Sequence, residues 1–572
     1  MRRAGLATAA SIALLLGAPA AAHAGAPSTP PNAIVRENAL AGSPDWQRQQ
    51  GGDIQVYGTE IGGRPGDAIH LHVSTAWRYR VLVYRLGWYA GAGAREVACL
   101  PDCSSDEQGR AQPVPPSPVS ALEPPLRAGW PVTDTVQTDP SWTTGYYLVE
   151  ALLTNGPSPG RVATTFFVLR EPDASPGSRI LVQVPVNTWE AYNAWDGHSL
   201  YDVNGGRVYR VSFERPWGPF SQSPFWWEIQ LVRFLEREGY DVSYQTDLDT
   251  DRDPGSLVRH RLVVVAGHDE YWTMSMRDAF DAAVAQGTNL AFMGSNAAYW
   301  HIEYEDDGQT IFGYKSLYDP NPVLAQKTAL WREIGRPECM LMGVQHQFIT
   351  QTPHQLDYTV VAPSGDPWLA GTGLNPGDTI SGVVGREHDV INPFPEACFH
   401  PGLTILFHYD GHGVDQNADA VRFTAPSGAR VFASGAQELS WALDDWRPDG
   451  GISSQVPVEA DRYAPADPRI QQFMRNALAD LTRPAAPQQL TATSSDRTVN
   501  VTIAASPDPR VLGFVARVRV GSRWRPLCRG VTTCTGFLPK GSYGPMVVGA
   551  VALDGTNRSS APDYVVTSTS QR

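Results

Sequence analysis

Residues 262–278, LVVVAGHDEYWTMSMRD, decide how the middle of the chain is expected to fold. Five apolar residues are followed directly by three ionisable ones, His268, Asp269 and Glu270, and then by two aromatic ones. An unbroken apolar run of this length is typical of a strand that is buried on both faces of a parallel sheet. The helix predicted around residues 275–287 then supplies the crossover connection that parallel strands need.

Four further segments of the middle region have the same pattern. They are RILVQVP (179–185), YDVSYQTD (240–247), NLAFMG (289–294) and ARVFASG (429–435). Their alternation with helical segments predicts a central open, mostly parallel α/β sheet. Ligands of such sheets lie beyond the carboxyl ends of the strands. In this chain those ends lead to a set of polar and aromatic side chains: Tyr192, Tyr201, His268, Glu270, Asn296 and Glu438.

The regions on either side have a different pattern. They contain short alternating apolar runs, such as AIHLHVST (68–75) and GPMVVGAVALDG (544–555), which are separated by turn-forming residues. Short strands joined by turns predict antiparallel β-sandwiches, and the second region resembles a fibronectin type III domain. The expected organisation is, in chain order, a signal peptide (1–24), an N-terminal β-sandwich (25–172), an α/β catalytic-like domain (173–483) and a small β-sandwich (484–572).

The first residues indicate the compartment. Arg2 and Arg3 precede an apolar stretch that ends near Leu16, and the small-x-small site Ala22-His23-Ala24 follows. This is the pattern of a secretory signal peptide, so we expect a mature chain that starts near Gly25 and is secreted or held in the cell envelope. The apolar stretch is shorter than the roughly 20 residues that span a bilayer. We therefore expect no stable membrane insertion after cleavage.

The composition excludes one class of partner and predicts covalent cross-links. The 572 residues carry a net charge of −14, which argues against nucleic acid because binding to phosphate backbones depends on basic patches. Six cysteines in an exported chain predict disulfides. Fifteen pairings are possible, and proximity in sequence favours three of them: Cys99 with Cys103, Cys528 with Cys534, and therefore Cys339 with Cys398.

Each polar residue at a strand end also has a structural explanation. Asp269 and Glu270 precede a helix, and a carboxylate near a helix N-terminus gains about 0.3–1 kcal/mol from the dipole. We favour this explanation for Asp269, whereas for Glu270 the two explanations are even. Ser275 and Asp278 have the spacing of a capping box. A single His268 is more often a hydrogen-bonded structural residue than a ligand.

Taken together, these residues resemble a known family. The runs AYNAWDGHSLYD (191–202), AGHDEYW (266–272) and GSNAAYW (294–300) resemble the large (catalytic) subunit of N,N-dimethylformamidase and its relatives. The resemblance extends over residues 179 to 310 and, more loosely, to about 480. It implies an amidohydrolase with a mononuclear iron, Fe³⁺ by ligand type, and a core like the α/β sheet of glutamine amidotransferases without their cysteine nucleophile.

The resemblance implies roles for individual residues. Glu270 matches the glutamate ligand of the iron, and Tyr192 and Tyr201 match its two tyrosine ligands. His268 and Asn296 match polar residues that line the metal pocket, and Glu438 matches a further pocket glutamate. In the formamidase a longer insertion separates the two tyrosine motifs, so Tyr299 or Tyr271 remain alternatives to Tyr201.

The residue types suit this chemistry. Two phenolates and a carboxylate are hard oxygen ligands that favour a trivalent ion such as ferric iron. Our hypothesis is that metal-bound hydroxide attacks an amide carbonyl. His268, whose unperturbed pKa is about 6.5, would shuttle the proton, and Asn296 would donate a hydrogen bond to the oxyanion. The substrate is a small-molecule amide that the sequence does not identify, and a small partner subunit or a homo-oligomer is left open.

Other site types have less support in the sequence. Gly294-Ser295-Asn296 does not supply the GxSxG turn of a serine hydrolase, and no Gly-rich phosphate loop follows a strand. A second functional class stays open, namely an exported protein whose aromatic crevice binds carbohydrate or cell-envelope material beside a vestigial metal site. Metal analysis distinguishes the two classes, because only the enzyme needs a bound ion.

Overall fold

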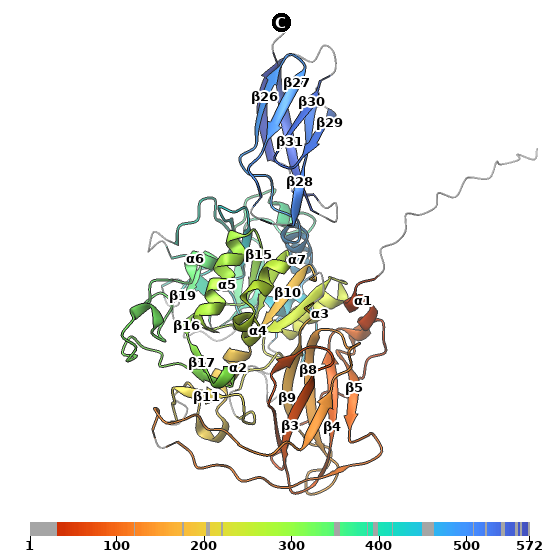
Figure 1. Cartoon of the computed structure of the whole chain (residues 1–572), viewed down its shortest axis with the longest axis vertical. Helices are drawn as coiled ribbons and strands as arrows, with labels where there is room; N and C mark the ends of the chain where they lie inside the picture. The colour runs from red at the N-terminus through yellow and green to blue at the C-terminus, as the bar shows by residue number, and fades with distance from the viewer. Residues whose placement is uncertain are drawn as a thin grey trace, which may run out of the picture.

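Three groups of β-sheets follow one another along the long axis of the molecule (Figure 1). The structure is a computed structural model. It describes residues 31–569 with the exception of 119, 174–176, 202–205, 219–220, 348–354, 386, 393–397, 414–415, 449–462, 507, 509, 521–522, 539–543, 555–558 and 561–562. The signal peptide predicted at 1–24 lies outside the described residues. The domain boundaries predicted at 172/173 and 483/484 stay predictions.

The first group consists of two sheets around a common core, as the alternating apolar runs predicted. Ile69, Leu71 and Val73 of one sheet pack with Val81 and Val83 of the other. The smaller sheet has the order β1-β3-β7, and the larger has the order β2-β9-β8-β4-β5 with β6 beside β4. Their bounds are β1 Gln55–Gly58, β2 Gly62–Gly63, β3 Ala68–Ser74, β4 Arg78–Leu86, β5 Ala94–Leu100, β6 Glu107–Gln108, β7 Asp134–Gln137, β8 Gly145–Leu153 and β9 Val162–Leu169.

The second group is built on a nine-stranded sheet of order β12-β10-β13-β15-β25-β24-β23-β20-β21. The first five strands in this order are parallel to one another. They are β12 Val242–Thr246, β10 Ile180–Val184, β13 Leu262–Ala266, β15 Asn289–Met293 and β25 Arg430–Ala433. All five lie within the apolar segments that the sequence predicted as strands.

The parallel strands are apolar throughout because both faces of the sheet are covered. Val263 and Val265 of β13 point into one buried cluster, whereas Leu262, Val264 and Ala266 point into another. Helices supply the cover and the crossovers. The α-helices among the described residues are α1 Ala33–Asn38, α2 Val186–Tyr192, α3 Ile229–Arg237, α4 Asp247–Arg252, α5 Met274–Ala285, α6 Cys339–Met342 and α7 Pro468–Leu481.

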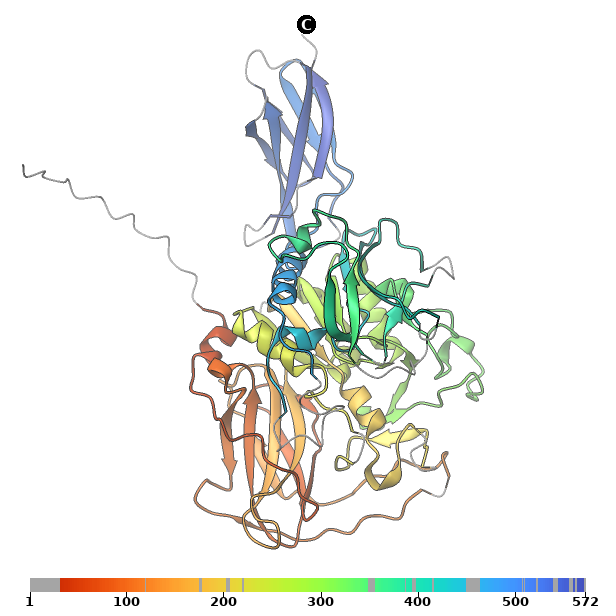
Figure 2. The same ribbon diagram turned by 180° about the vertical axis from the view of Figure 1, so that it is seen from behind.

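The prediction of a mostly parallel sheet was only partly correct. Four strands at one side pair antiparallel, and they face the viewer in green to cyan in Figure 2. They are β20 Leu356–Val360, β21 Thr379–Val384, β23 Thr404–Tyr409 and β24 Ala418–Thr424. Antiparallel pairs need no helical crossover between their strands. The likeness to glutamine amidotransferases stays a prediction.

The central domain also contains several short strands. Helix α5 begins at a different residue from the one predicted. The N-cap of α5 is Thr273, whose side chain accepts a hydrogen bond from the Met276 amide, so the predicted capping box at Ser275 and Asp278 was wrong. Both residues lie inside the helix, too late in the chain to cap it. The short strands are β11 Arg210–Ser212, β14 Tyr271–Trp272, β16 Trp300–His301, β17 Glu303–Glu305, β18 Thr310–Phe312, β19 Gln345–His346 and β22 Asp389–Val390.

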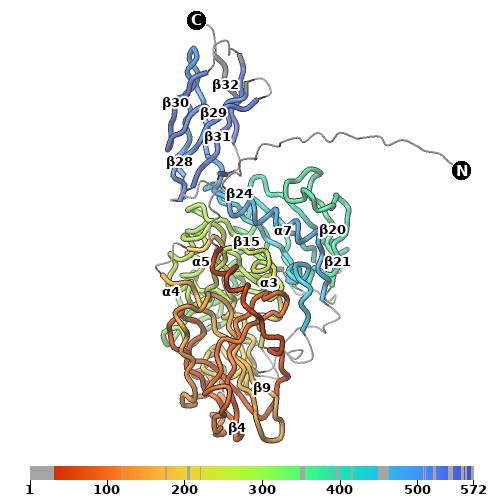
Figure 3. The backbone as a smooth tube through the Cα atoms, turned by 90° about the vertical axis from the view of Figure 1, so that its right-hand side faces the viewer, coloured from red at the N-terminus to blue at the C-terminus, as the bar shows by residue number. Residues whose placement is uncertain are grey.

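The third group is a small sandwich of two sheets, of order β26-β27-β30 and β29-β28-β31-β32. In Figure 3 it stands at the end of the central domain beside α7. Buried side chains of both sheets, such as Val499, Val501, Phe514 and Val548, share one core. The strands are β26 Thr491–Ser495, β27 Thr498–Thr502, β28 Val511–Val520, β29 Arg523–Gly530, β30 Thr533–Phe537, β31 Gly544–Asp554 and β32 Asp563–Thr569. No helix in the described part of the chain is long and apolar enough to cross a membrane.

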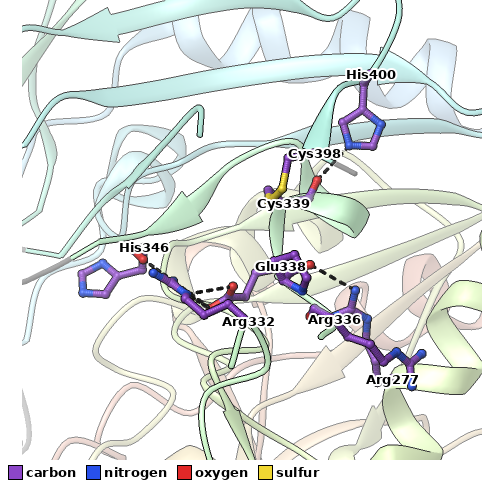
Figure 4. The surroundings of a disulfide bond; sticks show 9 residues. Arg277, Arg332, Arg336, Glu338, Cys339, His346, Cys398 and His400 are labelled. Carbon is purple, nitrogen blue, oxygen red and sulfur yellow. Dashed lines mark hydrogen bonds and ion pairs between the residues drawn. A yellow bond between two sulfur atoms is a disulfide. The ribbon is translucent and has the colours of Figure 1, made fainter. Parts of the chain in front are cut away.

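Two of the three predicted disulfides are present. Cys339 is bonded to Cys398, and Cys528 to Cys534. Figure 4 shows the first bond beside His400, whose Nε2 lies 2.8 Å from the carbonyl oxygen of Cys339. The predicted bond between Cys99 and Cys103 was wrong, because both are free thiols. The two thiols and the Glu96 carboxylate lie within 4.8 Å of one another, with Cys103 Sγ 3.8 Å from Glu96 Oε1.

Candidate functional site

Two glycines allow the loops that follow β13 and β15 to meet. Gly267 ends β13 with φ of +60°, and a Cβ built on Gly294 at the end of β15 would lie 1.8 Å from the Gly267 carbonyl oxygen. Only glycine permits this approach of the two backbones. The residues that follow them, His268 and Asn296, are thereby brought together, with Asn296 Nδ2 3.2 Å from His268 Nε2.

The segment from His268 to Glu270 is fixed by backbone pairing between the two loops. The amides of Ala298 and Tyr299 donate to the carbonyls of Asp269 and Glu270, at 2.8 and 2.9 Å. His268 and Glu270 share one side, as the alternation of an extended chain predicted, and their Nε2 and Oε2 atoms are 3.5 Å apart. The helix-dipole explanation of Asp269 was wrong.

The Asp269 side chain instead forms a hydrogen bond inside the sheet. It is buried, and its Oδ2 accepts a hydrogen bond of 2.9 Å from Gln183 on β10. Helix α5 begins only at Met274, so Asp269 is too far from the helix N-terminus to interact with its dipole. Burial raises the pKa of this carboxyl to about 7. Asp269 is therefore a structural residue for a different physical reason from the one expected.

Both predicted tyrosines point at the Glu270 carboxylate. Tyr192 is the last residue of α2, which follows β10, and its hydroxyl donates to Oε2 of Glu270 at 2.9 Å. The Tyr201 hydroxyl donates to Oε1 at 2.8 Å and to Oε2 at 3.0 Å. The two rings are stacked with centroids 4.2 Å apart. Three oxygen-bearing side chains from two strand-end loops thus meet at one point.

A second layer of side chains supports the tyrosines. The Tyr271 hydroxyl donates to the Tyr201 hydroxyl at 2.7 Å, and Lys315 Nζ donates to the Tyr271 hydroxyl at 2.8 Å. Lys315 Nζ also lies 3.5 Å from the centroid of the Tyr201 ring, a cation–π contact. Burial lowers the pKa of Lys315 to about 7, against the opposing effect of Glu270. Sequence reasoning missed Lys315, which lies shortly after the three-residue strand β18.

Glu387 completes the surroundings of His268 and was also missed. Its Oε2 lies 3.1 Å from His268 Nε2 and accepts from Asn296 Nδ2 at 3.0 Å and from Gln437 Nε2 at 3.3 Å. On the other side of the ring, Gln222 Nε2 lies 3.3 Å from His268 Nδ1. Glu387 belongs to GREHDV, which follows the apolar end of β21. A search for ionisable runs after apolar runs could have found it.

The electrostatics of the site divide it into two parts. Burial raises the pKa of the Tyr192 and Tyr201 phenols well above 10, and the Glu270 charge adds to this effect. Burial also raises the pKa of Glu270, although His268 opposes it. Without a cation, both phenols are therefore protonated donors to Glu270.

Around His268, by contrast, the surroundings stabilise the charged forms of His268 and Glu387. Burial acts to lower the pKa of His268, but Glu387 and Glu270 outweigh it, so the pKa is raised above 6.5. Burial acts to raise the pKa of Glu387, but His268 outweighs it and lowers the value to about 2. The charged forms of the His268 imidazole and the Glu387 carboxylate therefore stabilise each other.

Solvent reaches the cluster from one side. Glu270, His268 and Asn296 are buried, at 2%, 1% and 3% exposure, whereas Tyr192 and Tyr201 are partly exposed. The two tyrosines are thus the more exposed members of the cluster.

Two other residues proposed from the sequence, Glu438 and Tyr299, have contacts that differ from those of Tyr192 and Tyr201. Oε2 of Glu438 accepts a hydrogen bond of 3.2 Å from the Gln355 amide, and it is the preceding residue, Gln437, that contacts Glu387. The Tyr299 ring packs against Trp300 and His346. These contacts of Tyr299 give no reason to prefer it to Tyr201, which contacts Glu270 directly.

Two solved structures resemble a small part of this chain. A Fn3-like protein from Clostridium thermocellum is 14% identical, with 15% of this chain and 93% of that chain covered and a TM-score of 0.13. The spore cortex lytic enzyme SleM of Clostridium perfringens is 23% identical, and the match covers 16% of this chain and 31% of SleM with a TM-score of 0.13. These scores are too low to support an argument, so the fibronectin type III likeness stays a prediction.

Two curated relatives match part of the chain. The N,N-dimethylformamidase beta subunit of an Alcaligenes species is 30% identical over 306 residues, which are 44% of this chain and 38% of the relative. The N,N-dimethylformamidase beta subunit of Paracoccus aminophilus is 30% identical over 122 residues, which are 19% of this chain and 15% of the relative. The chain thus spans less than half the length of the curated relatives it matches. Both names give the beta subunit, whereas the sequence analysis named a large catalytic subunit.

A family model covers more of the chain than either relative. The model described as N,N-dimethylformamidase beta subunit-like, C-terminal, matches residues 80–453, which is more than half of the chain. The matched region includes Tyr192, Tyr201, His268, Glu270 and Asn296. The chain therefore belongs to the N,N-dimethylformamidase beta subunit-like family.

Proposed function

We propose that this chain is an exported, metal-dependent amidohydrolase that cleaves the C–N bond of a small amide and acts as a catalytic subunit. The observation that carries the proposal is that the hydroxyls of Tyr192 and Tyr201 both lie within 3.0 Å of one carboxylate, that of Glu270. Membership in a family named for an amide hydrolase supports the reaction class.

The donor set fits a small, highly charged cation such as ferric iron. Carboxylate and phenolate oxygens are hard ligands. The oxygen–oxygen separations of 2.8 to 3.0 Å bring the three donor groups close enough together to bind one ion. Tyr192, Tyr201 and Glu270 would hold the ion, which would have to displace the phenol protons. Once bound, it supplies Lewis-acid activation of water and of the amide carbonyl.

His268 is the residue that moves a proton. Its Nε2 lies between two carboxylates, 3.1 Å from Glu387 and 3.5 Å from Glu270, while Gln222 contacts Nδ1. An imidazole held from both sides keeps one fixed orientation. We infer that Nε2 gives its proton to the departing amine, because protonation makes the amine a better leaving group.

The contacts of Asn296 favour an orienting role. Its Nδ2 is engaged by Glu387 and His268, and its buried Oδ1 has no hydrogen-bond partner among the described residues. As placed, Asn296 offers a substrate an acceptor rather than the oxyanion donor that the sequence suggested. Its backbone has φ of +54°, which asparagine tolerates better than most residues. We infer that it orients His268 and Glu387.

The contacts favour an enzyme over a carbohydrate-binding crevice. Sugars bind to free aromatic faces, but the Tyr201 ring is covered by Tyr192 at 4.2 Å and by Lys315 at 3.5 Å. Both hydroxyls are committed to Glu270. This arrangement leaves little ring surface for a sugar.

The test is metal analysis combined with an assay of amine release. We expect the mature chain to bind about one iron and, in the ferric state, to absorb visible light, as hard phenolate ligands imply. The iron-loaded protein should release amine from N,N-dimethylformamide or from other small N-alkyl formamides and acetamides. A native mass measurement on the same preparation tests for assembly, which the subunit names of the relatives suggest. Iron binding without amine release would disprove the hydrolase, and a metal-free protein with full activity would disprove the metal site.

A further inference from the structure

The C-terminal sandwich has a charge opposite to that of the whole chain. Residues 484–572 contain ten Lys or Arg, four Asp and no Glu, although the chain has a net charge of −14. Two of the four aspartates, Asp508 and Asp554, form ion pairs with Arg261 of the central domain. The outer surface of the sandwich is therefore strongly basic, and such local charge selects anionic partners.

The register of the larger sheet gathers part of this charge on one face. Arg519 pairs with Trp524 across β28 and β29, and Arg517 pairs with Gly549 across β28 and β31. Gly549 in turn pairs with Tyr564 on β32. Directly paired residues of a sheet point to the same side. We call Arg517, Arg519, Trp524 and Tyr564 the basic–aromatic face.

The opposite side of the same strands forms the core of the sandwich. Ala516 and Val518, which alternate with the two arginines, are buried with Phe514 and Val548. The strict alternation of arginine with buried residues in β28 thus directs both guanidinium groups outward.

The two rings of this face form a platform over a glycine. Trp524 is 40% exposed and Tyr564 54% exposed, and their centroids are 5.6 Å apart with the planes inclined at 35°. A Cβ on Gly549 would lie 3.0 Å from Tyr564 Cε1 and 3.2 Å from Trp524 Cη2. The absence of a side chain at Gly549 lets both rings lie over β31. Trp524 therefore reaches across β28, between its two arginines.

The cations beside the rings are available for a ligand. Within the part of the sandwich that the structure describes, neither Arg517 nor Arg519 forms an ion pair, and both are exposed. The sandwich stands at one end of the molecule, away from the N-terminal sheets (Figure 1). The described part of the central domain therefore does not supply the missing anions.

We propose that the basic–aromatic face binds an anionic polysaccharide. Guanidinium groups bind carboxylate or phosphate groups in a two-pronged manner, and exposed Trp and Tyr rings offer flat apolar surface to sugar rings. Single-stranded nucleic acid needs a basic groove with successive stacking rings, whereas this face has a single ring pair. Such binding would hold the central domain next to carboxylated or phosphorylated polymer.

The sandwich itself offers a charge-matched control. Arg523 and Arg525 lie on β29 on either side of Trp524, so their side chains leave the strand on the side opposite to its ring. Both are exposed. Replacing these two arginines changes the net charge as much as replacing Arg517 and Arg519, but it leaves the basic–aromatic face intact.

The experiment measures retention of the full mature chain by polygalacturonate and by neutral dextran at low salt. We expect retention by polygalacturonate alone. The Arg517→Gln/Arg519→Gln variant should bind about tenfold more weakly, as expected for the loss of charge-assisted hydrogen bonds, and Trp524→Ala should also weaken binding. Arg523→Gln/Arg525→Gln should remain close to the unmodified chain. Melting temperatures confirm that the variants are folded.

Three results would overturn the proposal. One is equal loss of binding in the two double-arginine variants, which would indicate charge alone. Another is unchanged binding in Trp524→Ala. The third is tighter binding to oligo-dT or to phosphatidylglycerol vesicles than to polygalacturonate, which would assign the face to nucleic acid or to a lipid surface. Amine release is measured separately, so failure here is independent of the proposed hydrolase.

Discussion

Oε2 of Glu387 lies 3.1 Å from Nε2 of His268, although the two residues come from distant parts of the chain. Burial opposes the charge on each group, yet the attraction between them raises the pKa of His268 and lowers that of Glu387 to about 2. An ion pair of this kind fixes the direction of the imidazole next to Glu270. Four predictions test this and other features of the structure.

Replacing Glu387 with glutamine should slow amide hydrolysis without removing the metal. The amide that replaces the carboxylate would keep hydrogen bonds to its neighbours but lose the charge that holds His268 in place. We expect kcat to fall by about ten- to a hundredfold, the usual effect of removing such a supporting group, with iron content unchanged. The exposed Glu303→Gln is the matched control. Loss of iron in Glu387→Gln would instead make Glu387 a ligand.

Replacing Tyr201 with phenylalanine should weaken iron binding, because it removes one of the three oxygen-bearing groups around the site. Iron content and visible absorption of the ferric protein measure the effect. Tyr299→Phe should keep both, since the Tyr299 ring packs against Trp300 and His346. Tyr271→Phe should also keep iron, because its hydroxyl contacts Tyr201 rather than Glu270. Full iron content in Tyr201→Phe would show that the ligand assignment is wrong.

Replacing His260 with asparagine should make the protein more resistant to acid. The ring is 1% exposed, and burial lowers its pKa from 6.5 to about 4. Between these values the unfolded chain binds a proton that the folded chain does not, so the free energy of unfolding falls as the pH drops from 6.5 to 4. The loss amounts to about 3 kcal/mol.

Unfolding by urea between pH 7 and pH 4 measures this effect. Asparagine can still donate to the Ser178 carbonyl oxygen, which lies 2.8 Å from Nδ1 of His260. The asparagine amide does not titrate in this range. The difference in free energy of unfolding between the original chain and His260→Asn should therefore shrink steadily as the pH falls. His412→Asn, at a side chain that is 83% exposed, is the control. The prediction would be contradicted if the free energies of unfolding of the original chain and of His260→Asn changed with pH in parallel.

Removing the Cys339–Cys398 bond should destabilise the central domain more than removing Cys528–Cys534 destabilises the sandwich. The first bond joins residues 59 apart and the second joins residues 6 apart. Loop-closure entropy predicts losses of about 4 and about 2 kcal/mol. Paired Cys→Ala variants and calorimetry of each transition test this order. Cys99→Ala/Cys103→Ala, which removes no bond, should have the smallest effect.

Local sequence patterns were sufficient for several parts of this molecule. The apolar runs at β10, β12, β13, β15 and β25 predicted all five parallel strands, because a strand covered on both faces must be apolar throughout. The alternating runs at the two ends predicted sheets that share a core. Ionisable or aromatic residues after those runs identified Tyr192, Tyr201, Glu270 and His268, which the fold brings together.

Tertiary structure alone decided the rest. The antiparallel strands β20, β21, β23 and β24 carry no long apolar run, and their pairing depends on non-local contacts that a linear pattern does not contain. Glu387 and Lys315 enter the site from loops distant in sequence. The thiols of Cys99 and Cys103 are free although they lie within 4.8 Å of each other, which spacing in the sequence does not reveal. Local patterns thus determine which segments form strands and which groups end them, whereas packing in three dimensions determines which of those groups meet.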